Sequence, residues 1–161
     1  MLEITYSDDE GVLVEIEITG TLEELREIEK ALNDLAQGRA KEAIFDGRMD
    51  FVPKFNDGWI KELILISGEG NVTIIGEPQG SVVIEGSPEK LDELSSYFYF
   101  EEDDKYPEHH HCEWREDHPC LSPASIPLVI SIVGTEEEIA KWEGDQDYSH
   151  RTMLSWGQPL T

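Results

Sequence analysis

The sequence predicts an α+β fold: a largely antiparallel sheet with two or three helices, built from a repeated strand-turn-helix unit. Three observations support this prediction. A strand, a glycine turn and a helix recur at three places, further alternating strands lie between them, and the chain has the size of one globular domain. Its 161 residues, 39% of them apolar, suffice for one core. We therefore expect residues 1–161 to form a single domain, with 134–161 as a peripheral helix and tail.

The strand-turn-helix unit consists of an alternating apolar strand, a glycine, a serine or threonine, and a helix with an apolar face. The three copies begin at Val14, Ser81 and Pro127. Their glycines are Gly20, Gly86 and Gly134, and their helix N-cap candidates are Thr21, Ser87 and Thr135. A glutamate three residues later completes a capping box in the first and third copies, and Pro88 takes the first helical position in the second. The unequal spacing of the copies indicates a unit reused in one compact domain rather than a solenoid.

Further strands are predicted between the units. The segments LEITYS and GVLVEIEIT are separated by DDE, which predicts an N-terminal hairpin. The segments KELILIS, NVTIIGE and SVVIEG follow one another across GEG and PQG, which predicts a three-stranded meander. Residues 44–58 carry mixed signals, and we expect a long loop there with at most a short strand.

The charge balance is strongly acidic. Thirty-six Asp and Glu residues face twelve Lys and Arg residues, for a formal net charge of -24. Such a chain repels phosphate backbones and anionic lipids, which argues against binding to nucleic acid or to a membrane surface. It attracts a basic protein partner or cations instead, although an acidic surface also serves solubility alone.

The sequence favours a cytoplasmic protein. Its start, MLEITYSDDE, has no basic segment followed by an apolar run, and no apolar stretch approaches the ~20 residues that cross a bilayer. Two cysteines are too few for a disulfide framework, so we expect reduced thiols.

The most unusual stretch is EHHHCEWREDHPC, residues 108–120, which holds four of the five histidines and both cysteines. We expect a strand at 108–114, a turn near 115–119 and a further strand from about 127. Alternate residues of a strand share a face. One face would then present His109, His111 and Glu113, and the other would direct His110, Cys112 and Trp114 toward the core.

A metal site is the alternative interpretation of this stretch. Two histidines at His-x-His spacing on one strand face can bind one ion, and a glutamate can add an oxygen ligand. The run His109-x-His111 followed by Glu116 resembles the first motif of the cupin family, and that resemblance implies these three residues as metal ligands. The glycines of the cupin motif are replaced here by Asp103 and Pro123, and no second cupin motif is present.

Other catalytic signals are weak, so we expect no enzyme activity and no cofactor. Cys112 or Cys120 with His118 has the residue types of a nucleophile and its base, but a thiol that faces the core is inert. No glycine-rich phosphate loop is present, and the acidic run at 101–104 lacks the spaced ligands of an EF-hand.

The chain resembles the immunity protein 32 family of bacterial polymorphic toxin systems. The resemblance rests on ITGTLEELREI, VIEGSPEKLDEL and the strand HHHCE followed by LSPASIPLVI, and it covers roughly residues 12–133. It implies an α+β immunity protein that binds and neutralises a cognate toxin, without catalysis and without a cofactor. Residues 134–161 lie outside it.

A basic, nuclease-like toxin would suit the acidic surface, because opposite charges steer two proteins together. The partner-binding candidates are exposed acids, an aromatic residue and histidines near one another. They are Glu101, Glu102, Asp103, Asp104, Tyr106, His109, His111 and Glu113. Two alternatives stay open at this point: the acidic run is simply a solvated loop, and the chain is a structural or regulatory domain.

Overall fold

The computed structural model describes residues 1–53, 56–117 and 120–142. It has the predicted α+β fold, but its strands form two mixed sheets instead of one largely antiparallel sheet. The five-stranded sheet runs in the order β4-β1-β2-β9-β8 and contains β1 (Glu3–Asp9), β2 (Val12–Gly20), β4 (Gly58–Trp59), β8 (His109–Cys112) and β9 (Leu128–Ile132). The four-stranded sheet runs in the order β3-β5-β7-β6 and contains β3 (Glu42–Asp46), β5 (Glu62–Ser67), β6 (Thr73–Gly76) and β7 (Ser81–Gly86).

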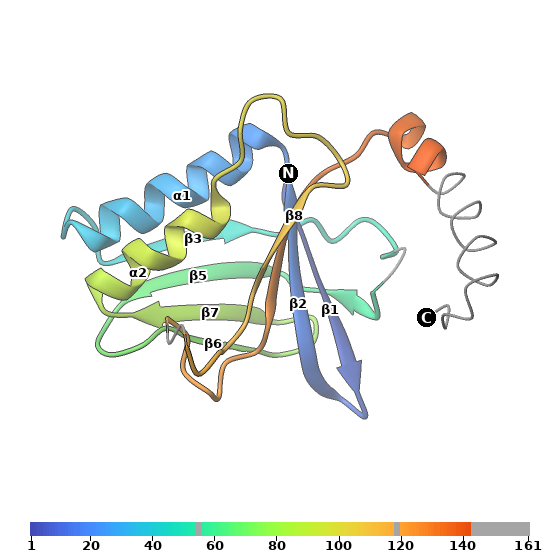
Figure 1. Cartoon of the computed structure of the whole chain (residues 1–161). Coiled ribbons are helices and arrows are strands. Elements are labelled where there is room, and N and C mark those ends of the chain that lie inside the picture. The colour runs from blue at the N-terminus through green and yellow to red at the C-terminus, as the bar shows by residue number, and fades with distance from the viewer. Residues whose placement is uncertain (54–55, 118–119, 143–161) are drawn as a thin grey trace.

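Two α-helices lie over one face of the four-stranded sheet (Figure 1). They are α1 (Leu22–Ala36) and α2 (Pro88–Ser95), and the 3-10 helix η1 (Ser96–Phe98) continues from the second. The helices contact β5 and β7 and pack against each other. Their buried faces and the inner faces of both sheets belong to one cluster of buried apolar side chains. Among the described residues, no helix has the length and apolar character needed to span a membrane.

All three strand-turn-helix units are present, and each begins its helix with the predicted cap. Thr21 Oγ1 accepts a hydrogen bond from the Glu24 amide at 3.1 Å, and the Glu24 carboxylate accepts one from the Thr21 amide at 3.0 Å. Ser87 caps α2 through the amide of Lys90. Thr135 and Glu138 form the same reciprocal pair as the first unit, at the start of a helix described over residues 136–142. The rest of the predicted tail, 143–161, lies outside the described residues.

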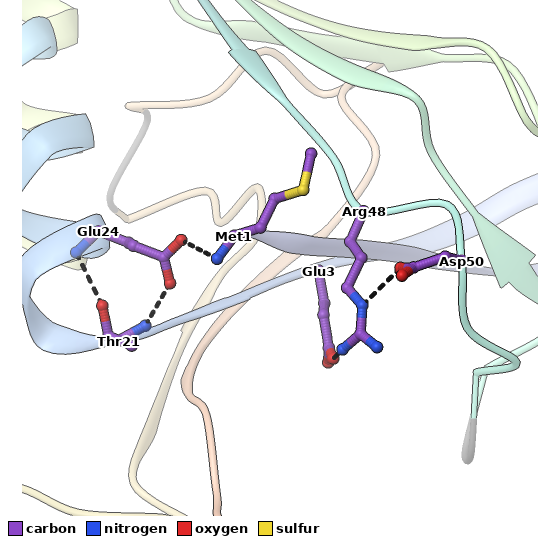
Figure 2. A network of polar contacts seen from close by, with 6 residues as sticks. All are labelled: Met1, Glu3, Thr21, Glu24, Arg48 and Asp50. Carbon is purple, nitrogen blue, oxygen red and sulfur yellow. Dashed lines mark hydrogen bonds and ion pairs between the residues drawn. The ribbon is translucent and has the colours of Figure 1, made fainter.

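Polar contacts hold the first residues of the chain against α1 and the loop after β3 (Figure 2). The amino group of Met1 lies 2.8 Å from the Glu24 carboxylate. This carboxylate therefore accepts from the Thr21 amide in the helix cap and also pairs with the amino group of Met1. Arg48 binds Glu3 at 3.1 Å and Asp50 at 2.6 Å. Surface ion pairs of this kind contribute little free energy singly.

The predicted N-terminal hairpin is confirmed, since β1 and β2 pair antiparallel. The predicted meander is wrong. β7 lies between β5 and β6, parallel to β5 and antiparallel to β6. This order places the fully buried Leu63 and Leu65 of β5 beside Val82 and Ile84 of β7. An alternating pattern fixes which face of a strand is buried but not which strand lies next to it, so the sequence pattern could not reveal this order.

Candidate binding surface on the edge strand

The histidine stretch forms β8, which is shorter than predicted. The strand ends at Cys112, opposite Leu128, because β9 begins at Leu128 and offers no earlier partner residue. Cys112 is 2% exposed and faces the core, as expected. The prediction for Trp114 is wrong: its side chain is 43% exposed, because it lies beyond the end of the strand, where strand alternation no longer sets direction.

His110 is a packed residue. Its ring stacks on Phe100 with centroids 4.2 Å apart, and its Nδ1 lies 2.8 Å from the carbonyl oxygen of Tyr97. These contacts tie β8 to η1 and to the segment that follows it. His110 therefore belongs to the structural side of the strand, as predicted, while its neighbours His109 and His111 are exposed.

Among the strands of the described residues, β8 lies at the end of the five-stranded sheet and has β9 as its one neighbour. The Ile132 amide donates to the Glu108 carbonyl oxygen at 3.1 Å. Because antiparallel partners alternate between bonded and non-bonded pairs, the backbone groups of His109 and His111 then point away from β9. These two residues give the strand a polar edge that another chain can approach.

A shallow hollow of about 400 Å³ lies along this edge. It is lined by Ser96, Tyr97, His109, His110 and His111. A hollow lined by two residues of η1 and three of β8 leaves space beside the edge for an approaching segment.

His109 and His111 lie on the same side of β8, as predicted, with ring centroids 4.8 Å apart. The Nδ1 of His109 is 2.8 Å from the Pro107 carbonyl oxygen, which can only accept, so this nitrogen is the donor. Within residues 1–53, 56–117 and 120–142, no three histidine, cysteine or acidic side chains converge as a metal site needs. Glu116 is exposed and does not complete the pair, and His118 lies outside the described residues.

The acidic run forms a closed turn just before β8. The Glu101 amide donates to the Asp104 carboxylate at 2.6 Å, and the Asp104 amide donates to the Glu101 carbonyl oxygen at 3.0 Å. Glu102 is 89% exposed, and its carboxylate lies 3.8 Å from the guanidinium group of Arg26 in α1. An exposed ion pair at this separation contributes little free energy. Glu101, Glu102 and Asp103 are thus exposed together, while Asp104 is half-buried and holds the turn.

The Tyr106 side chain packs against other residues of the same chain. A methyl group at Gly134 would lie 2.7 Å from the Tyr106 ring. The ring therefore packs directly against this glycine and leaves no space for a larger residue. The Tyr106 ring also meets the Trp142 ring edge-on at 5.9 Å. Of the predicted binding residues, Tyr106 therefore anchors the loop against the third unit, whereas Glu113 is exposed just after β8.

The two thiols lack nucleophilic character. Burial, together with smaller contributions from the nearby Cys120 and Glu113, raises the pKa of Cys112 to about 12. Burial likewise raises the pKa of Cys120 to about 11, with Glu93 adding to the effect. Thiolates are the reactive form of cysteine, so these residues do not form a nucleophilic centre near neutral pH.

A polar network on the outer face of the five-stranded sheet was not evident from the sequence pattern. Asn56 donates to Thr5 at 2.6 Å and to Glu17 at 2.9 Å, and it accepts from Ser7. Ser131 of β9 donates to the other oxygen of Glu17 at 2.6 Å. The polar positions of β1 and β2 were visible in the alternating pattern, but Asn56 sits in a segment with mixed signals, and only the fold brings it to them.

Comparisons of the chain with protein-family models, with curated proteins and with solved structures gave no match. The resemblance to the immunity protein 32 family therefore stays a prediction.

Proposed function

We propose that this chain is an immunity-type inhibitor that binds a basic protein toxin through the edge of β8 and the acidic turn before it. One observation carries the proposal. An exposed acidic turn, Glu101–Asp104, leads within a few residues to a polar strand edge with a hollow beside it. A partner could thus contact negative charge and the edge of a strand at one place on the surface.

Electrostatic attraction would act first, while the chain and a basic partner approach each other. A chain with a net charge of -24 draws a basic partner toward it at long range, and such steering raises association rates at low salt. Nuclease-like toxins carry basic grooves for phosphate, and an acidic inhibitor can cover such a groove. The exposed carboxylates of Glu101, Glu102 and Asp103 provide the local contact charge.

The edge of β8 would then set the orientation of the bound partner. A partner segment in extended conformation can add to the edge of β8 by hydrogen bonding to the backbone of His109 and His111. The imidazoles of these two residues would then contact alternate side chains of the added strand, and Glu113 is exposed just after β8.

The first test is a pull-down with the biotinylated chain from a lysate of the source organism in which toxin expression has been confirmed. Bound proteins are identified by mass spectrometry at about 50 mM and about 300 mM salt. We expect a basic polypeptide in stoichiometric amount, held less strongly at the higher salt. Recovery of no specific protein would sink the proposal.

Matched charge variants locate the contact. Glu102→Gln/Asp103→Asn neutralises two exposed acids of the turn, and Asp9→Asn/Glu10→Gln neutralises two at the tip of the β1–β2 hairpin, at the other end of the molecule (Figure 1). We expect the first pair to slow association with the recovered partner several-fold more than the second. Equal decreases in association rate would show that the net charge of the chain, and not the acidic turn, determines the rate.

A backbone variant tests the strand edge. His111→Pro removes an amide that points away from β9, so β8 can keep its pairing while the edge loses a donor. His111→Ala removes the imidazole and keeps the amide. We expect proline to weaken partner binding more than alanine does, and equal binding by both variants would rule out strand addition.

A metal-dependent protein built on His109 and His111 is the second candidate, favoured by the 4.8 Å separation of their rings. It predicts near-stoichiometric transition metal in untagged protein, lost in His109→Ala/His111→Ala. Metal analysis of the untagged chain decides between the two candidates, because the inhibitor requires no bound metal.

A further inference from the structure

A row of aliphatic side chains crosses the outer face of the four-stranded sheet. The register pairs Ile44 of β3 with Ile64 of β5, Ile64 with Val83 of β7, and Val83 with Ile75 of β6. Residues in register on adjacent strands point to the same side of a sheet, so these four form one continuous row. We call Ile44, Ile64, Val83 and Ile75 the aliphatic row.

The aliphatic row faces away from the core. The intervening residues of the same strands, such as Leu63 and Val82, are fully buried in the core that the helices share. Ile44 is 54% exposed and Ile75 is 56% exposed, at the two ends of the row. Both α-helices lie on the opposite face of this sheet (Figure 1).

Acidic residues flank the aliphatic row on both sides. Two positions along the strands, Glu42 and Glu85 stand on one side of the row, and Asp46 and Glu62 stand on the other. Within the described part of the chain, none of these four carboxylates forms an ion pair. The face thus combines an apolar strip with carboxylates on both of its sides, and Ile66 lies between Glu42 and Glu85 on one of them.

The dimensions of this face follow from sheet geometry. Adjacent strands lie about 4.8 Å apart, so a row across four strands is roughly 14 Å long, and the flanking carboxylates begin about 7 Å to either side. A helix of about ten residues has the same length as the row and presents one stripe of side chains to it.

We propose that this face docks a basic amphipathic segment of a protein partner, with an aliphatic ridge that is bordered on both sides by lysine or arginine. Charge complementarity selects this occupant. A second copy of the chain would set four carboxylates against four, between two molecules that each carry a net charge of -24. The surface lies on a different sheet from β8, and the inference does not depend on the proposed function.

The test uses two synthetic peptides of equal charge, KLKAKLAALKAKLK and KAKAKAAAAKAKAK. Both carry the same lysines, and only the first adds a leucine stripe. Each is titrated into the isotope-labelled full chain while backbone amide shifts are followed. We expect the leucine peptide to bind at least about tenfold more tightly, a difference of roughly 1.4 kcal/mol. The largest shifts should fall in β3, β5, β7 and β6.

Two matched double variants isolate the aliphatic row. Ile44→Thr/Ile75→Thr removes apolar surface and keeps β-branched side chains that suit a strand. Met49→Thr/Val52→Thr removes exposed apolar surface from the loop after β3 instead. The first variant should abolish the preference for the leucine peptide, and the second should retain it. The shift map of the unmodified chain gives the answer independently if a variant does not fold.

Three results would overturn the proposal. Equal affinity for both peptides would show that charge alone drives binding. Shifts centred on β8 and the acidic turn would place the amphipathic partner on the other surface. Sedimentation that shows a dimer of the native chain and a monomer of Ile44→Thr/Ile75→Thr would identify a second copy as the occupant of the aliphatic row.

Discussion

Ser131 donates a hydrogen bond of 2.6 Å to Glu17 and joins two adjacent strands across a sequence separation of 114 residues. The other oxygen of the same carboxylate accepts from Asn56 at 2.9 Å, and Asn56 in turn donates to Thr5. One half-buried carboxylate thus connects β1, β2, β9 and the loop that precedes β4. The parallel pairing of β2 with β9 positions β8, so this network supports the candidate binding edge from behind.

Replacement of Glu17 by Ala should lower the free energy of unfolding by about 1–3 kcal/mol, because two part-buried donors lose their acceptor. Glu15→Ala is the matched control, since Glu15 lies on the same face of β2 and no hydrogen bond of its side chain occurs among the described residues. Its loss should stay within about 0.5 kcal/mol. Urea unfolding of both variants measures the difference, and equal losses would contradict a role for the network.

The Glu24 carboxylate makes the stability of the fold depend on pH. Burial alone would raise its pKa, but hydrogen bonds from the Met1 amino group and the Thr21 amide, with the charge of that amino group, outweigh burial and lower it. A carboxylate with a lowered pKa stabilises the fold above its unfolded-state pKa, and this contribution disappears as the pH falls through the folded-state value.

Glu24→Gln should therefore be less stable than the native chain at pH 7, and the gap should close in acid, below the ordinary carboxyl pKa of about 4. Urea unfolding at several pH values measures it. Glu27→Gln is the control on the same helix, because Glu27 is exposed and forms no ion pair within the described residues. A gap that persists unchanged at low pH would refute the assignment of the effect to the charged carboxylate.

Gly134 and Tyr106 should be coupled in stability. Gly134→Ala places a methyl group 2.7 Å from the Tyr106 ring and 3.0 Å from Ile139, and overpacking of this kind costs about 1–3 kcal/mol. Tyr106→Ala opens that space, so Gly134→Ala should cost much less in the Tyr106→Ala background. Unfolding free energies of the two single variants and the double variant measure the coupling, and additive losses would show that the ring does not occupy the space at Gly134.

The thiols of Cys112 and Cys120 should react slowly with a disulfide reagent in the native protein. A pKa of about 12 for Cys112, against an ordinary value of 9.0, leaves its thiolate about a thousandfold scarcer near neutral pH. Both thiols should react fully once urea unfolds the chain, with glutathione as the reference rate. Rapid labelling of one cysteine in the folded protein would show that its side chain is accessible and active.

Local chemistry made the strand-turn-helix units predictable. A hydroxyl residue followed by Glu or Pro within one turn decides where a helix begins, through contacts among neighbouring residues, and all three caps lie where the sequence placed them. The opposite faces of His110 and His111 follow equally from strand alternation. Trp114 shows the limit of that rule, because alternation ends where the partner strand ends, and that point is set by β9.

The sequence by itself thus determined the α+β class, the helix starts, the opposite faces of His110 and His111 and the acidic character of the chain, since these depend on near neighbours and composition. Only the tertiary structure decided that β7 separates β5 from β6, that Tyr106 packs on Gly134, that Asn56 reaches Glu17, and that four aliphatic residues from four strands form one row on the outer face of a sheet. Each of these joins residues far apart in the chain. Their proximity depends on which strands pair, and an alternating pattern is equally compatible with several pairings.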